Sequence, residues 1–420
     1  MEANLIMAVP FSRSSLRFVL AGMVAGAGLG ALVLWAVHWA PRLRPAVRET
    51  AAGPGDSRRN AIVRAVESAH HSVVTVRVEG GRREASAKDD ALWFPFKVGR
   101  AGRYDWVGSG FFIDRRGYII TNEHVINGAD HIVISVGDAD RGMSLPATLV
   151  GSAPQYDLAL LRVDSLFTHA GVGLGAERPA FEPARLGDSD DVMVGEWAIA
   201  IGSPFGSEFG NVAPSVSVGV ISAVQRDLPT FDPDRPLGPY QRMIQTDAAI
   251  NQGNSGGPLV NANGEVIGVN AVNFASVREG STGIHFAIPI NTARWVAAEL
   301  LQYGEVRRPW IGWSVEEVDA GVRRRLQLPE DQGILTVRGV VPGSPAEVAG
   351  IRADDVLQSI QGMDPYSLSR AERILFGTPV GADIAVEVLR DGQVRRSVVH
   401  VEEDPLSRAE RIQRTARAAG

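Results

Sequence analysis

Gly253-Asn254-Ser255-Gly256-Gly257-Pro258-Leu259 places a serine between glycines, after a polar turn and before an apolar strand. Glycines permit a tight backbone turn that side chains would block. Such a turn can direct the hydroxyl of Ser255 outward while the amides of Gly253 and Ser255, with Asn254 between them, surround one point. An oxyanion formed during acyl transfer would be held at that point. Because a serine alcohol is a poor nucleophile by itself, this interpretation requires a base and a residue that orients the base.

Both partners are present upstream of the serine. His124 follows the strand-like stretch Phe111 to Ile120, and Asp157 opens the apolar run Asp157-Leu158-Ala159-Leu160-Leu161. A lone histidine is usually structural, and an aspartate that opens a strand is usually a turn residue. The order His, Asp, Ser is nevertheless that of the double β-barrel serine proteases, and it differs from the order in subtilisin-like and α/β-hydrolase enzymes. The three residues together predict a catalytic triad.

Composition narrows the class of protein. A chain of 420 residues with 46 glycines, 24 prolines and 45% hydrophobic residues is typical of two or three turn-rich β domains. The net charge of −6 gives no indication of nucleic-acid binding, and the lack of cysteine excludes disulfides and thiolate chemistry. The 8 histidines are scattered, and the one adjacent pair, His70-His71, would point its rings apart. We expect no metal and no organic cofactor.

The N-terminal region predicts a membrane anchor. Residues 18–37 carry no charge and are roughly 20 residues long, enough to cross a bilayer as a helix. A signal peptide usually has a shorter apolar core and a cleavage site with small residues, so an uncleaved anchor over residues 18–40 is favoured over a removed leader. An N-terminal segment, 1–17, precedes this anchor. A flexible stem rich in Arg, Pro, Gly and Ala follows it over residues 41–59.

The rest of the chain divides into two units and a tail. Residues 60–304 contain short apolar strands separated by turn residues, the pattern of a sandwich or barrel, and close with a helix at Thr292 to Tyr303. Residues 305–403 contain five predicted strands, the first at Ile311 to Val315, and two short helices, which indicates a small α+β module. The basic tail, 404–420, has arginines at helical spacing and predicts a solvated helix.

One heptapeptide, Leu-Ser-Arg-Ala-Glu-Arg-Ile, occurs twice, at Leu368 to Ile374 and at Leu406 to Ile412. Each copy holds a serine with a glutamate three residues later, the pattern of a capping box at a helix start. A local duplication of a helix start is one explanation. The alternative hypothesis is that the tail can occupy the place of the module's own helix.

Several motifs resemble those of the HtrA/Deg serine proteases. Thr121-Asn122-Glu123-His124-Val125, the run that opens at Asp157, the block QTDAAINQGNSGGPL and the block GIHFAIPIN match this family, and Trp310-Ile311-Gly312-Trp313 with GSPAEVAGIRADDVLQSI resembles its PDZ domain. The resemblance covers residues 60–401. It implies a mostly β fold, with a chymotrypsin-like double β-barrel protease domain followed by a small α+β PDZ domain and preceded by a transmembrane helix. One span and one PDZ domain are similar to the membrane-anchored, DegS-like members.

The resemblance also implies roles and partners. His124 would be the general base, Asp157 the residue that orients it, and Ser255 the nucleophile. The expected activity is membrane-anchored hydrolysis of peptide bonds in misfolded or regulatory proteins, regulated by C-terminal peptides at the PDZ domain. The expected assembly is a homotrimer, held by a single pass in the bacterial inner membrane with its catalytic part in the periplasm. The alternative function is a protease-like chaperone or peptide-binding scaffold with little turnover.

Two recognition sites can be placed on the sequence. In enzymes with this triad order, the primary specificity pocket would be lined here by Ala249, Ile250, Ile284, His285 and Phe286. These residues are mostly small or apolar, so a small aliphatic substrate side chain is expected. His285 stands where the family usually has glycine or another small residue, so a narrower pocket is the alternative expectation.

The second recognition site lies in the C-terminal module. A strand edge that begins at Trp310 could accept an extended peptide by strand addition. The amides of Ile311 and Gly312 would face a terminal carboxylate, and Trp313 would lie in the side-chain pocket. Aromatic residues that simply fill a small core are the alternative interpretation.

Overall fold

The computed structural model describes residues 58–80, 104–137, 143–163, 181–203, 214–228, 241–251, 253–273, 283–318, 335–365 and 367–419. The predicted anchor over residues 18–40 lies outside these ranges, as does nearly all of the predicted stem. Among the helices within them, none is both long enough and apolar enough to cross a bilayer.

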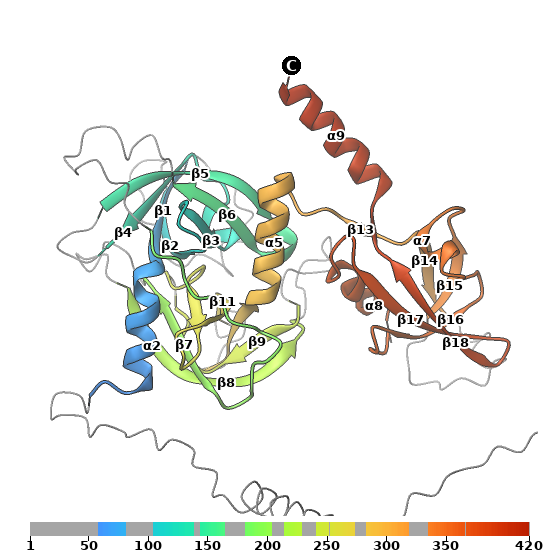
Figure 1. Ribbon diagram of the computed structural model, residues 1–420, viewed down its shortest axis with the longest axis horizontal. Helices are drawn as coiled ribbons and strands as arrows, with labels where there is room; N and C mark the ends of the chain where they lie inside the picture. Colours follow the sequence, from blue (N-terminus) through green and yellow to red (C-terminus); the bar gives the residue numbers. More distant parts are fainter. Residues whose placement is uncertain are drawn as a thin grey trace, which may run out of the picture. The chain divides into compact units, whose positions relative to one another are not determined.

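Six antiparallel strands close into a first barrel in the order β1-β2-β3-β6-β5-β4 (Figure 1). The strands are β1 (Val73–Gly80), β2 (Tyr104–Phe112), β3 (Tyr118–Thr121), β4 (His131–Val136), β5 (Met143–Ala153) and β6 (Leu158–Val163). Alternate residues fill the interior, because successive side chains of a strand point to opposite faces. Phe112, Ile119 and Leu161 are among the residues of that inner cluster.

Six further strands close into a second barrel in the order β10-β11-β12-β9-β8-β7. They are β7 (Trp197–Gly202), β8 (Ser215–Arg226), β9 (Met243–Thr246), β10 (Pro258–Val260), β11 (Val266–Asn273) and β12 (His285–Pro289). Ile221, Ile244 and Leu259 belong to its interior cluster. The fold is therefore mostly β with two six-stranded barrels, and the double barrel implied by the family resemblance is confirmed.

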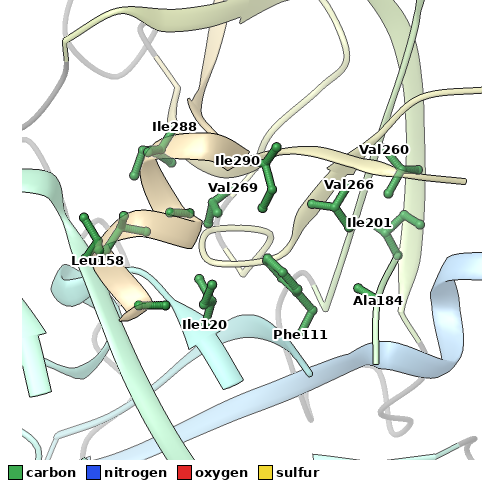
Figure 2. Packing of buried hydrophobic residues seen from close by; sticks show 14 of the residues in the cluster. Phe111, Ile120, Leu158, Ala184, Ile201, Val260, Val266, Val269, Ile288 and Ile290 are labelled. Atoms are coloured by element: carbon green, nitrogen blue, oxygen red, sulfur yellow. The ribbon is translucent and has the colours of Figure 1, made fainter. Parts of the chain in front are cut away.

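A third cluster lies on the outer faces of both barrels and joins them (Figure 2). Phe111, Ile120 and Leu158 contribute from the first barrel, each adjacent in sequence to a residue that points into that barrel. Ile201 and Val269 contribute from the second barrel. Two helices add apolar residues to the same cluster, α2 (Ala61–Ala69) and α5 (Ile290–Tyr303). Alternate residues of these strands thus pack inside their own barrel, and the residues between them pack against the other barrel.

The expected strand-like stretch from Phe111 to Ile120 is two strands with a turn between them. The carboxylate of Asp114 accepts hydrogen bonds from the amides of Arg116 and Tyr118, at 2.9 and 3.3 Å. Gly117 has φ 89, a conformation that favours glycine. The chain therefore reverses here, and β3 pairs with β2 as a hairpin.

The C-terminal module contains a five-stranded antiparallel sheet in the order β14-β15-β16-β17-β18. The strands are β14 (Trp313–Glu317), β15 (Leu335–Val340), β16 (Val356–Ile360), β17 (Asp383–Arg390) and β18 (Gln393–His400), with two helices, α7 (Pro345–Val348) and α8 (Leu368–Phe376). The predicted strand Ile311 to Val315 is interrupted at Gly312, which has φ 82. Before the break, β13 (Pro309–Trp310) pairs instead with β19 (Glu402–Glu403).

The tail forms the helix α9 (Pro405–Ala419). Its first turn is capped by Asp404, whose carboxylate accepts from the amide of Leu406 at 3.0 Å. Helix α8 is capped by Ser367, which accepts from the amide of Arg370. Both caps lie before the repeated heptapeptide, so the capping box expected inside each copy does not start either helix. The side chain of Leu406 is 76% exposed, as expected for a solvated helix.

A buried ion pair connects two strands of the C-terminal module. The guanidinium of Arg390 on β17 forms two hydrogen bonds of 2.6 Å with the carboxylate of Asp355, whose side chain is fully buried at the start of β16. The Arg352 amide donates to the same carboxylate at 2.9 Å. Removing the cation would leave an uncompensated buried carboxylate, which is strongly destabilising.

We therefore expect Arg390→Met to lower the free energy of unfolding of this module by about 3 kcal/mol. The matched control is Arg396→Met, because Arg396 forms an exposed pair with Glu387 at 2.7 Å and has a side chain that is 83% exposed. Its expected loss is below about 1 kcal/mol. Urea unfolding followed by circular dichroism measures both. Equal losses in the two variants would contradict the assignment of this buried pair as a structural element.

Candidate active site

His124 and Asp157 are held together at one end of the first barrel. His124 lies in the short helix α4 (Glu123–Ile126), directly after β3, and Asp157 directly precedes β6. The Nδ1 atom of His124 is 2.8 Å from Oδ2 and 2.9 Å from Oδ1 of Asp157, and the His124 backbone amide donates to Oδ1 at 3.0 Å. Asp157 is only 3% exposed. The carboxylate thus fixes both the ring and the backbone of the histidine, and Nε2 is the ring nitrogen that can receive a proton from a nucleophile.

The backbone at Asp157 is left-handed, with φ 50 and ψ 43. The side chain of Asn122, which is fully buried, donates to the Asp157 carbonyl oxygen at 2.9 Å. This bond links the residue two before His124 to the residue that orients His124. Sequence reasoning did not select Asn122, because no spacing rule relates it to a residue 35 positions away.

Ser255 lies in a turn that approaches β2 of the first barrel. Its carbonyl accepts from the amide of Ser109 on β2 at 2.8 Å, and the Ser109 hydroxyl donates to the Gly253 carbonyl at 2.5 Å. Gly256, with φ 84, has no room for a side chain: a Cβ there would lie 2.2 Å from the Ser109 carbonyl oxygen and 3.1 Å from the Asn122 amide. The glycine next to the serine therefore permits contact with the segment that leads to His124.

The amides around Ser255 are not equivalent. The Asn254 amide donates to the Asn251 carbonyl at 3.0 Å, whereas the amides of Gly253 and Ser255 have no hydrogen-bond partner within the described ranges. Those two amides are thus the ones available to an oxyanion. The Ser255 hydroxyl donates to the Ala271 carbonyl at 3.2 Å. Rotation about the Cα–Cβ bond of Ser255 would break this hydrogen bond and direct the hydroxyl to a different acceptor.

The five residues expected to line a specificity pocket do not share one surface. Phe286 packs into the cluster between the barrels, and Ile284 packs against that cluster. Ile250 belongs to the interior of the second barrel, and His285 lies on the same side, since it alternates with Phe286 along the strand. Nδ1 of His285 accepts a hydrogen bond from the Ile250 amide at 3.3 Å. Ala249 is linked through its carbonyl to the Ser217 hydroxyl at 2.5 Å.

The segment Trp310 to Trp313 has the geometry of a turn before an edge strand. The Ile311 side chain is buried in the module core, and a Cβ on Gly312 would lie 2.2 Å from that of Ser344. The amides of Ile311 and Gly312 have no hydrogen-bond partner in the part of the chain that the structure describes. Trp313 starts β14, the edge strand of the sheet, and packs partly against the core. No group of three or more His, Asp or Glu side chains in that same part is placed to hold a metal.

The buried position of His285 generates a prediction about acid stability. Burial lowers the pKa of His285 below its usual 6.5, and the charge of Asp247 only partly opposes that shift. The unfolded chain therefore binds a proton at this ring more readily than the folded protein, so the free energy of unfolding falls as the pH drops below 6.5.

Replacing His285 by Asn removes this titration. Between about pH 7.5 and about pH 5.5, we expect the variant to lose less of its free energy of unfolding than the wild type does. Urea titrations at both pH values measure the difference, and the other acid-sensitive groups cancel in the comparison. An equal or larger loss in the variant would contradict the expected direction of the pKa shift.

Comparison with known proteins identifies a domain family for the barrels and another for the C-terminal module. Residues 108–269 match the trypsin-like peptidase domain, and residues 309–401 match the PDZ domain. A probable periplasmic serine endoprotease DegP-like of Halomonas elongata is 39% identical over 299 residues, which cover 71% of this chain and 57% of that protein. A protein of the same description from Pseudomonas putida is 39% identical over 288 residues, covering 68% of this chain and 54% of that protein. The chain thus spans little more than half the length of these relatives.

Solved structures match a larger share of their own length. The HtrA-type protease AlgW with decapeptide has a TM-score of 0.57 and 31% identity, covering 82% of this chain and 99% of that chain. AlgW with tripeptide has a TM-score of 0.56 at 31% identity, covering 82% and 97%. The chain thus has two barrels and one PDZ domain, and it is about 31% identical to a solved relative over nearly the whole of that relative. It belongs to the HtrA family of serine proteases.

Proposed function

We propose that this protein is a serine endopeptidase that cleaves misfolded or regulatory proteins through an acyl-enzyme. The observation that carries this proposal is the joint placement of Asp157, His124 and the Ser255 turn. Asp157 holds His124 through three contacts of 3.0 Å or less, and Gly256 brings the serine turn against Asn122. The names of the relatives, which describe serine endoproteases, support the same activity.

The proposed reaction follows from these positions. Nε2 of His124 takes the proton of the Ser255 hydroxyl as the oxygen attacks the peptide carbonyl, and the amides of Gly253 and Ser255 stabilise the resulting oxyanion. His124 then gives the proton to the leaving amine. In the second half of the reaction, water attacks the acyl-enzyme while His124 takes its proton, and His124 returns that proton to the Ser255 oxygen as the acyl group leaves. Asp157 keeps the imidazole in the tautomer that has its hydrogen on Nδ1 and stabilises the imidazolium.

The Ser255→Ala variant tests this proposal against the alternative of a chaperone or binding scaffold. We expect casein cleavage to fall by at least about 10³-fold, because the nucleophile is lost while the binding surfaces remain. A fluorophosphonate probe should label the wild type and not the variant. A mixture of C-terminal peptides is included in every assay, in case the resting enzyme requires one. Cleavage by the variant at the wild-type rate would overturn the assignment of Ser255 as the nucleophile. Absence of both cleavage and labelling in the wild type would leave the scaffold function.

We propose further that the PDZ domain binds C-terminal peptides and regulates the protease. The unpaired amides of Ile311 and Gly312, followed by the edge strand β14, support a carboxylate site with strand addition. The AlgW structures contain a decapeptide or a tripeptide, by their descriptions. Helix α8 contacts β14, and its Arg370 and Arg373 lie 3.7 Å from Asp227, just after β8. A shift of α8 when a peptide binds along β14 would therefore reach the second barrel directly.

We propose a homotrimer that is anchored in the bacterial inner membrane with its catalytic part in the periplasm. The apolar stretch 18–37 and the periplasmic relatives support this location. An apolar surface on the second barrel supports self-association. Trp197 is 47% exposed and Val218 39% exposed on paired strands, and their register places them on the same outer face. Three further exposed apolar side chains accompany them: Met193, Val194 and Val216.

The Trp197→Glu, Val218→Glu double variant tests the proposed assembly. Two buried charges would oppose an apolar interface, so the mass of the soluble part (residues 60 to 420) should fall from that of three chains to that of one. Size-exclusion chromatography with light scattering measures this mass. The control is Leu149→Glu, a comparably exposed residue on β5, at 47%. A double variant that keeps the wild-type mass would exclude this surface as the interface.

A further inference from the structure

His285 lies between two strands of the second barrel, one of which contacts the Ser255 hydroxyl. It is the first residue of β12 and pairs with Thr246 on β9 and with Asn273 on β11. Two residues before Asn273, the Ala271 carbonyl accepts the hydrogen bond from the Ser255 hydroxyl. The strand that carries His285 is therefore the direct neighbour of the strand that contacts the nucleophile.

The imidazole also holds the segment that leads into the nucleophile turn. Its Nδ1 atom accepts from the amide of Ile250, five residues before Ser255 in the sequence. The ring lies on the barrel-interior side of β12 with Ala287, away from Phe286. A substrate side chain that enters between the segment at Ile250 and β12 would therefore meet this ring, not that of Phe286.

The hydrogen bond at Nδ1 decides what the other ring nitrogen can do. Because Nδ1 accepts, the neutral ring carries its hydrogen on Nε2. Nε2 has no hydrogen-bond partner among the residues with described positions, although the whole residue is only 6% exposed. Five side-chain polar atoms in those ranges are buried without a hydrogen-bond partner: Asn122 Oδ1, Asn254 Oδ1, Asn270 Oδ1, Trp295 Nε1 and Arg373 Nε. The His285 nitrogen is not one of these five atoms.

We propose that His285 is a specificity-determining residue whose Nε2–H donates a hydrogen bond to the substrate side chain on the acyl side of the cleaved bond. The inference rests on the proposed endopeptidase activity. It replaces the expectation of a purely aliphatic preference with a preference for side chains that carry an oxygen acceptor, such as Thr and Asn. When Val or Leu binds instead, the donor is removed from water and receives no partner, which is unfavourable.

The expected discrimination is set by one neutral hydrogen bond. Thr and Val have nearly the same shape, as do Asn and Leu, so each pair isolates the acceptor from size. A neutral hydrogen bond of this kind corresponds to a preference of about threefold to tenfold. We therefore expect kcat/KM to be higher by that factor for Thr than for Val, and for Asn than for Leu.

Four quenched fluorescent peptides that differ only at this substrate position test the proposal on the purified full chain. They are assayed at about pH 7.5, where the lowered pKa of His285 keeps the ring neutral. His285→Asn retains an acceptor near the place of Nδ1 and loses the distal donor, so the preference for Thr and Asn should disappear. His285→Gln retains a distal donor, so the preference should persist. Fluorophosphonate labelling to the wild-type extent shows that each variant is folded at its active site.

The outcomes separate this inference from the function on which it rests. Labelling of Ser255 with equal cleavage within each peptide pair would overturn the role of His285 alone. The same holds if His285→Asn keeps the full wild-type preference. Absence of labelling in the wild type, with C-terminal peptides present, would overturn the endopeptidase activity and the pocket assignment together.

Discussion

The hydrogen bond from the amide of Ser109 to the carbonyl of Ser255 is the contact on which the proposed active site depends. It joins a strand of the first barrel to the Ser255 turn of the second at 2.8 Å. The Ser109 hydroxyl accepts from the Ser203 amide at 2.8 Å and donates to the Gly253 carbonyl, so one buried residue contacts two segments of the second barrel. Because Gly256 has no side chain, this approach is close enough to set the serine against the segment that leads to His124.

The apolar cluster between the barrels makes that approach stable. Each contributing strand has residues that face its own barrel and residues that face the other, as with Phe112 and Phe111. The helix α5 packs against both barrels, since it contacts β5 and β6 as well as β11 and β12. Polar chemistry is thus placed at the edge of a large apolar contact, where water is restricted and hydrogen bonds to a developing charge are stronger than in water.

Much of the fold was predictable because it depends on local patterns. Alternating apolar runs predicted the strands, and the glycines at 253 and 256 predicted a tight turn around the serine. Other features depend on residues far apart in the chain. The left-handed backbone of Asp157 is stabilised by the side chain of Asn122, and the Ser109 contacts reach 144 positions along the chain. The placement of the pocket residues was missed for a local reason: adjacent residues of a strand point to opposite faces, so His285 and Phe286 do not line one surface.

The repeated heptapeptide separates what the sequence determines from what the tertiary structure decides. Both copies are helical, because the same residues have the same local preference for helix. In α8, Ala371 and Ile374 are buried, at 3% and 9% exposure, because a sheet lies against that face. In α9, the equivalent of Ile374 is Ile412, which is 54% exposed. Identical side chains thus specify the helix, but burial requires a partner surface, and only the folded chain supplies one.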